Sequence, residues 1–242
     1  MFIAKNISKS LQGFPVVQDV SLTVAPGTIT AIVGPSGGGK TTLLRSLSMI
    51  ETPDSGSISI DGREYHFPMA EGAQFTPPWP EMTVVFQQLF LWPHITLRQN
   101  LLLPIEDKLT PERKELVEEV IDFFGMRQFI DRYPSEVSGG QKQRLALARA
   151  IALQPKYLLL DEITSALDVE QIAKILEFLL VVKDKGCGMI IVTHHLNFAK
   201  RAANQIICLD QGRAIEQGGS EILENPQNPR IKTFLSHVLA AS

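Results

Sequence analysis

The stretch that decides the fold covers residues 34 to 41 and reads Gly34-Pro35-Ser36-Gly37-Gly38-Gly39-Lys40-Thr41. It follows the apolar run of residues 29–33 and precedes a helical pattern that begins at Thr42. The spacing G-x-x-x-x-G-K-[ST] between a strand and a helix is typical of phosphate-binding loops, in which backbone N–H groups turn inward around an anion. Glycine suits such a loop because a Cβ would hold the chain too far away or forbid the required φ. The sequence therefore predicts a phosphate site formed by residues 34–42.

Lys40 and Thr41 add side-chain chemistry to this loop. The start of a helix favours an anion, and Lys40 supplies a mobile charge able to reach the β- and γ-phosphates of a nucleotide. The hydroxyl of Thr41 is then left to hold Mg²⁺. The alternative is a glycine-rich turn that merely precedes Lys-Thr, and its placement between a strand and a helix disfavours that interpretation.

Length, charge and cysteine content limit the classes of protein. The chain of 242 residues is long enough for one large or two small domains with a substantial core. A net charge of −3 with mixed signs does not indicate nucleic acid as the main partner. Cys187 and Cys208 have no metal or redox spacing, so we expect two small buried hydrophobic residues in a reducing compartment. We find no apolar run near the ~20 residues that cross a bilayer and no signal-peptide pattern, and we expect at most a peripheral place at a membrane.

The hydrophobic pattern predicts antiparallel strands at the start of the chain and alternating strands and helices later. Strands are expected at residues 2–7, 16–24, 28–33, 57–60, 82–86, 157–160, 189–193 and 205–209. Four prolines between residues 63 and 81 predict an ordered surface loop, because proline cannot supply the hydrogen bonds of a strand. The alternation predicts a mainly parallel sheet with helices on both faces.

Helices are expected from Thr110, from about Asp168, and at residues 196–203. The first of these has one apolar face, formed by Leu116, Val117, Val120, Ile121 and Phe124. Because no strand pattern occurs there, we expect an all-helical insert at about residues 93–152.

Two carboxylates follow the apolar strand pattern of residues 157–160. A carboxylate at the carboxyl end of a strand beside the phosphate loop can hold Mg²⁺, which is the role we predict for Asp161. Glu162 then projects where an attacking water would lie and can act as general base. The alternative is a pair of solvated acids in a turn.

A second anion-binding pattern occurs about a hundred residues after the first. Ser138, Gly139, Gly140 and Gln141 lead directly into a helical pattern, so that backbone amides and a hydroxyl again meet at a helix start. Because the chain has a single phosphate loop of the first kind, we expect the second pattern to complete the site of another subunit.

These motifs resemble those of the ABC-type ATPases, whose signature is Leu-Ser-Gly-Gly-Gln and whose two copies enclose two ATP molecules head to tail. The resemblance covers about residues 6–239, with Val137 in place of the signature leucine. It implies a P-loop NTPase (RecA-like) α/β core at about residues 1–92 and 153–242, which includes an antiparallel β subdomain, and a helical subdomain at 93–152 that carries the signature. It also implies ATP and Mg²⁺ as cofactors and ATP hydrolysis as the activity.

The resemblance assigns roles to further residues. Gln87 matches the Q-loop glutamine, expected to touch Mg²⁺ and the attacking water. Residues 165–168 match the D-loop, with Asp168 at the nucleotide site, and His194 matches the switch histidine at the γ-phosphate. Two positions depart from the pattern: Leu11 stands where an aromatic residue usually stacks on adenine, with Phe14 three residues later, and Ile163 replaces a proline. Either Phe14 takes over that stacking or base recognition is weak.

Among ABC ATPases, the chain looks most like the ATPase subunits of bacterial polar amino-acid importers, on residues 150–152, 192–199 and 224–236. This implies a peripheral subunit at the cytoplasmic face of the inner membrane. The implied partners are a second copy of the chain, integral membrane permease subunits and, indirectly, a periplasmic or extracellular solute-binding protein. The alternatives are another ABC importer or exporter, a soluble ABC ATPase of DNA repair or translation, and a P-loop kinase, which would not explain residues 138–141.

The run from Gln87 to His94 joins the expected core to the helical insert. In the resembled family this seam receives a short helix of the membrane subunit, and we predict that Phe90 or Trp92 helps to form that groove. The alternative is that both aromatic side chains pack inside the seam.

Overall fold

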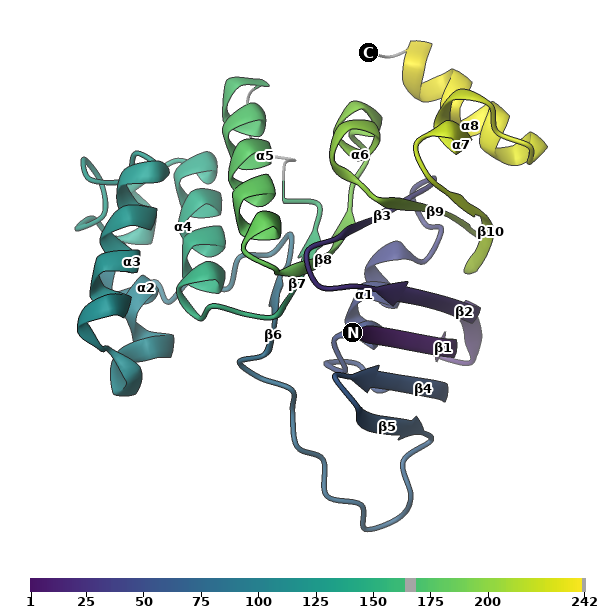
Figure 1. Ribbon diagram of the computed structural model, residues 1–242, viewed down its shortest axis with the longest axis horizontal. Helices are drawn as coiled ribbons and strands as arrows, with labels where there is room; N and C mark the ends of the chain where they lie inside the picture. The colour runs from purple at the N-terminus through teal and green to yellow at the C-terminus, as the bar shows by residue number, and fades with distance from the viewer. Residues whose placement is uncertain (164–168, 241–242) are drawn as a thin grey trace.

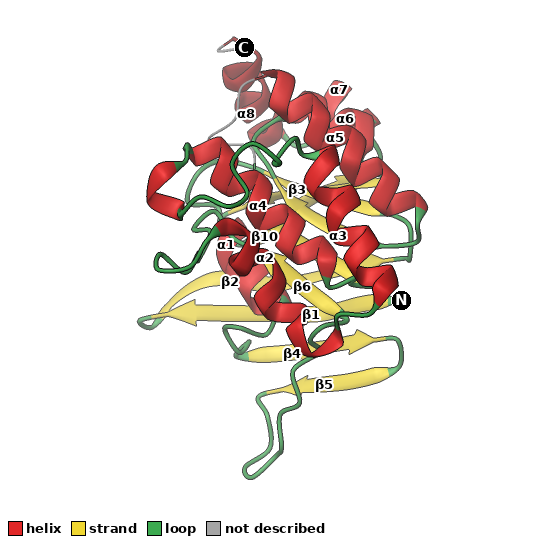
Figure 2. Ribbon diagram, turned by 90° about the vertical axis from the view of Figure 1, so that its left-hand side faces the viewer, coloured by secondary structure: helices red, strands yellow, loops and turns green. Residues whose placement is uncertain are grey.

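The computed structural model describes residues 1–163 and 169–240 and contains two sheets. The first is antiparallel, with strand order β2-β1-β4-β5. Its strands are β1 (Phe2–Leu11), β2 (Phe14–Val24), β4 (Ser55–Ile60) and β5 (Arg63–Phe67). β5 corrects the expectation of a loop from residue 63, because the first proline of that stretch is Pro68 and residues 63–67 are free to pair with β4. Only residues 68–81 form the long projecting loop (Figure 2).

The second sheet has the order β10-β9-β3-β8-β7-β6 and is parallel except for β10. Its strands are β3 (Ile29–Val33), β6 (Met82–Val85), β7 (Tyr157–Asp161), β8 (Gly188–Val192), β9 (Gln205–Asp210) and β10 (Arg213–Gly218). The predicted strands at 28–33, 82–86, 157–160, 189–193 and 205–209 are confirmed to within one or two residues. The fold class predicted from the sequence is therefore confirmed.

Helices occupy the remaining regular segments. They are α1 (Lys40–Leu47), α2 (Leu97–Leu102), η1 (Leu103–Lys108), α3 (Pro111–Phe123), η2 (Pro134–Glu136), α4 (Gly139–Ala152), α5 (Val169–Asp184), α6 (Leu196–Ala202), α7 (Glu221–Glu224) and α8 (Pro229–Ala240). Thr110 caps α3 as predicted, because its hydroxyl accepts a hydrogen bond from the N–H of Arg113 at 3.3 Å. Residues 93–152 contain helices and no strand.

The two faces of the parallel sheet are covered differently. Alternate residues of β3 show this: Ile29 packs in a cluster with α4 and α5, Ala31 with α6, α7 and α8, and Ile32 with α1 and the antiparallel sheet. Helices thus lie on both faces as expected, and on one of these faces α1 shares the surface with the antiparallel sheet (Figure 1). Cys187 and Cys208 are free and buried, as predicted, and burial raises the pKa of each thiol to about 12.

Candidate functional site

The parallel pairing of four strands gathers the candidate residues at one edge of the sheet. β3, β6, β7 and β8 run in the same direction, so their carboxyl ends meet at that edge. β3 leads into residues 34–39, β6 ends two residues before Gln87, β7 ends at Asp161, and β8 ends two residues before His194. Segments far apart in the sequence thus converge on the start of α1.

The phosphate loop packs tightly against two other strands. A Cβ on Gly34 would lie 2.0 Å from the carbonyl oxygen of Leu209 in β9, and a Cβ on Gly39 would lie 2.5 Å from that of Val16 in β2. Both glycines also have positive φ, of 147° and 96°. Close contact with protein backbone therefore requires glycine at these two positions. The sequence had suggested a different reason, the close approach of an anion to the loop.

Lys40 is only 5% exposed, and its side chain curls back onto the loop. Its Nζ donates to the carbonyl oxygens of Gly34 at 2.9 Å and Pro35 at 2.8 Å. Burial lowers the pKa of the Lys40 ammonium from its ordinary value, and the nearby charges of Glu162 and Asp161 oppose that effect. The ammonium is therefore held at the loop and close to the two carboxylates that were predicted to share the site.

Thr41 and Asp161 are brought together by the start of α1 and the end of β7. The Thr41 hydroxyl donates to Oδ1 of Asp161 at 3.2 Å, and Asp161 is 2% exposed. Burial raises the pKa of this carboxyl, while the hydrogen bond from Thr41 opposes the rise. One hydroxyl and one carboxylate beside a phosphate loop are a donor set that suits Mg²⁺, which binds through one or two protein oxygens together with phosphates and water. The residues present therefore fit this ion.

Glu162 and His194 form the second pair at this edge. Nε2 of His194 lies 2.6 Å from Oε1 of Glu162, so the two predicted catalytic side chains are in contact. The N–H of Glu162 donates to the carbonyl oxygen of Val192 at 3.0 Å, and Glu162 has a φ of 49°. This left-handed backbone turns the side chain at the end of β7, and such positions cost free energy and often occur at functional sites.

Gln143 is a residue that the sequence did not single out. It lies on α4, is almost fully buried, and its amide donates to the carbonyl oxygen of Ile163, directly after Glu162. A buried glutamine cannot be told from an exposed one by helical spacing alone, which is why the pattern missed it. Through this contact α4 supports the chain beside the candidate general base.

Ser138 and Gln141 cap α4. The Ser138 hydroxyl accepts from the N–H of Gln141 at 3.3 Å, and Oε1 of Gln141 accepts from the N–H of Ser138 at 2.9 Å. Ser138 and Gly139 are exposed, and Gly140 is buried. Within residues 1–163 and 169–240, no hydrogen bond joins residues 138–141 to residues 34–42. α4 and α1 belong to the apolar clusters on opposite faces of the sheet.

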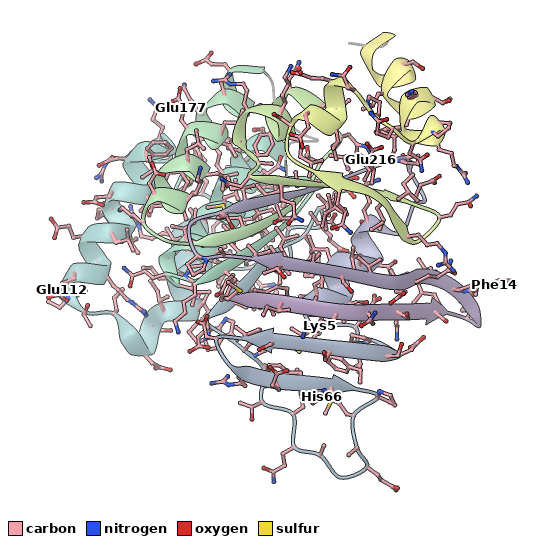
Figure 3. All side chains as sticks on the ribbon, turned by 45° about the vertical axis from the view of Figure 1, so that its right-hand side comes forward. Lys5, Phe14, His66, Glu112, Glu177 and Glu216 are labelled. Carbon is pink, nitrogen blue, oxygen red and sulfur yellow. The ribbon has the colours of Figure 1, made fainter. Side chains whose placement is uncertain are left out.

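Three further predictions concern Gln87, the D-loop and the residue that stacks on adenine. Gln87 is exposed, two residues beyond β6. Asp168 and the rest of the predicted D-loop lie outside the described residues. Leu11 is 40% exposed and Phe14 74% exposed at the turn between β1 and β2, and Phe14 projects from the tip of that hairpin (Figure 3).

Comparison with known proteins identifies the family. Residues 17–165 match the family described as ABC transporter. The chain is 38% identical to the glutamine transport ATP-binding protein GlnQ of Escherichia coli (strain K12), over 97% of this chain and 98% of the relative. It is 34% identical to the arginine transport ATP-binding protein ArtP of Haemophilus influenzae, over 96% of this chain and 98% of the relative. It is also 38% identical to the L-cystine import ATP-binding protein TcyN of Bacillus subtilis (strain 168), over 98% of this chain and 93% of the relative.

A solved structure is similar to the whole fold. It is a dimeric post-hydrolysis state of an ATP-binding cassette bound to ADP and Pi, with a TM-score of 0.78 and 28% identity over 91% of this chain and 99% of that chain. The chain therefore belongs to the ABC transporter family, as its motifs predicted, and it is an ATPase of that family.

Among the residues that the structure describes, none of the helices combines the length and the apolar character that a membrane span needs.

Proposed function

We propose that this chain is the ATP-hydrolysing subunit of an ABC importer for polar amino acids, bound to the cytoplasmic face of the cell membrane. The observation that carries the ATPase chemistry is the meeting of the phosphate loop, the Thr41–Asp161 contact and the Glu162–His194 contact at one edge of the sheet. The substrate class rests on the relatives, which are transport proteins for glutamine, arginine and cystine. The transported amino acid is recognised by other subunits, so this chain does not determine it.

The loop and its lysine bind the nucleotide phosphates in this proposal. Backbone N–H groups at the start of α1 would bind the phosphates, and Lys40, which now contacts the carbonyl oxygens of Gly34 and Pro35, would pair with phosphate oxygens. Thr41, Asp161 and Gln87 would hold Mg²⁺, and the bound ion would neutralise charge that develops on the phosphates.

Glu162 acts as general base on the attacking water. Its carboxylate lies near Lys40 and contacts His194, whereas the carboxylate of Asp161 already accepts a hydrogen bond from Thr41. The contact with His194 leaves the second carboxylate oxygen of Glu162 available for the proton of the water. In this proposal His194 also contacts the γ-phosphate.

A second copy of the chain completes the site. Residues 138–141 present an exposed serine and glycine at the start of α4, yet they belong to a different side of the molecule from α1. The proposal that residues 138–141 of each copy meet the nucleotide of the other follows from this separation, and the similar solved cassette is dimeric. The same role is proposed for Asp168 from its match to the D-loop alone.

The membrane subunit docks on an aromatic groove in this proposal. A cavity of about 360 Å³ lies between the end of β6, residues 88–90 and 92, and the carboxyl half of α4, and Trp79 of the projecting loop forms part of its wall. Phe90 is 57% exposed and Trp92 45% exposed, which favours the groove over the alternative of two packed core residues. Arg149 of α4 donates to the carbonyl oxygens of Leu89 at 2.8 Å and Phe90 at 3.1 Å, so the groove is fixed to the helix that begins at Ser138.

The test is reconstitution of the native complex. The chain would be isolated from its own membrane with its permease and receptor, and inserted in proteoliposomes with ATP inside and a panel of labelled polar amino acids outside. We expect ATP-dependent uptake of one of these amino acids and its loss in Lys40→Ala. Uptake of other solutes only, or export, would refute the substrate class and leave the ATPase assignment intact.

A further inference from the structure

The turn between β9 and β10 forms a support for the phosphate loop. The N–H of Gly212 donates to the carbonyl oxygen of Gly38 at 3.0 Å. Gly34 packs directly against Leu209, at the end of β9, because glycine has no Cβ. On its other side the turn is joined to β2, because the N–H of Gln18 donates to the carbonyl oxygen of Gly212 at 2.8 Å. A shift of this turn would therefore move the loop that binds the phosphates.

Arg230 holds the same turn from a distant part of the chain. Its Nε donates to Oδ2 of Asp210 at 2.7 Å, and its guanidinium also donates to the side chain of Gln211 at 3.0 Å. The Asp210 side chain is 11% exposed and that of Arg230 is 57% exposed, so the carboxylate end of this ion pair is shielded while the guanidinium is partly in water. The planar guanidinium thus bridges two successive residues of the turn.

The position of Arg230 is itself well defined, since it lies in the first turn of α8. Asn228 accepts a hydrogen bond from the N–H of Arg230 at 2.9 Å, and Glu216 of β10 accepts from the N–H groups of Gln227 and Asn228 at 2.9 and 3.1 Å. Figure 3 shows Glu216 beside this part of the chain. Ile231 is buried in the cluster that joins α8 to the sheet. The arginine is therefore presented from a fixed element and not from a free tail.

A hollow lies between the loop and α8. Its volume is about 530 Å³, and it is lined by residues 35–38 on one side and by Arg230, Thr233 and Phe234 on the other. Because this space is not filled by side chains, Asp210 and Gln211 have room to move when the contact with Arg230 is lost.

We infer that Arg230 is a positioning residue for ATP binding: through Asp210 and Gln211 it fixes the β9–β10 turn against the phosphate loop, so that the C-terminal helix sets the affinity for nucleotide. The chemistry at Glu162 does not involve this contact. Loss of the contact therefore weakens ATP binding and leaves the maximal rate unchanged.

The test uses the full chain with two measurements, the dissociation constant of a fluorescent ATP analogue and the KM and kcat of ATP hydrolysis. We expect Arg230→Gln and Asp210→Asn each to raise the dissociation constant and KM about fivefold with kcat within twofold of the native value. The double variant should show no more than the change in Arg230→Gln alone, because both substitutions remove the same Arg230–Asp210 ion pair. Arg230→Lys, which can still pair with Asp210, should restore most of the affinity.

Lys200→Gln is the matched control. It removes the exposed ion pair between Lys200 and Glu224, which does not touch the turn, and it should leave KM unchanged. Three outcomes would overturn the inference: an unchanged dissociation constant in Arg230→Gln, a fall in kcat without a change in KM, or effects that multiply to about 25-fold in the double variant. If Arg230→Gln does not fold, Asp210→Asn decides the question by the same criteria.

Discussion

Replacement of Glu162 by glutamine separates hydrolysis from binding. The amide oxygen of glutamine can still accept a hydrogen bond from Nε2 of His194, which lies 2.6 Å from Oε1 of Glu162, so the local geometry is expected to persist. The amide cannot take a proton from water at neutral pH. A positioned general base contributes a factor of about 10² to 10⁴. This corresponds to about 3–5 kcal/mol of activation free energy.

The assay is phosphate release at saturating ATP, with nucleotide binding measured in parallel. We expect Glu162→Gln to lose hydrolysis by at least ~10²-fold and to keep its affinity for ATP within a few-fold. Glu170→Gln is the matched control, since Glu170 is an exposed acid at the start of α5 that pairs with Lys174. Hydrolysis within tenfold of the native rate in Glu162→Gln would remove Glu162 from the role of general base.

Three further predictions concern assembly, stability and docking. Glu162→Gln with ATP and Mg²⁺ should shift from monomer to dimer in light scattering, and adding Ser138→Arg should block the shift because the arginine fills the exposed start of α4; a mass that stays monomeric with ATP would contradict the dimer proposal for the isolated chain. Burial raises the pKa of Asp161, so its contribution to stability is present below the ordinary pKa and lost as the pH rises through the folded-state pKa. Asp161→Asn should therefore melt a few degrees higher than the native chain at pH 7.5 without Mg²⁺, yet bind Mg-ATP less tightly, and a lower melting temperature would refute this reasoning. Trp92→Ala should reduce recovery of the membrane complex and transport while the ATPase rate of the free chain persists; equal loss of both, with a lower melting temperature, would show that Trp92 is a core residue.

Local patterns predicted much of this molecule correctly. The strand positions follow from runs of apolar residues, and the Thr110 cap follows from a side chain that bonds to backbone three residues away. The phosphate loop was recognised from the spacing of its glycines with Lys40 and Thr41. These features involve near neighbours in the chain, so their energetics can be read from sequence. The prediction of a loop at residues 63–67 was wrong because the prolines that indicated it begin only at Pro68, and residues 63–67 pair with β4 as strand β5.

Tertiary structure alone decided the contacts that cross the chain. That β2 and β9 press on Gly39 and Gly34, that Gln143 supports Ile163, and that one face of the parallel sheet is covered by another sheet all depend on strand order. Side-chain pairs such as Arg230 and Asp210 are joined across turns that sequence spacing does not encode. The physical reason is that such contacts arise from the shared packing of several elements, whereas a sequence pattern reports only which face of a single element is apolar.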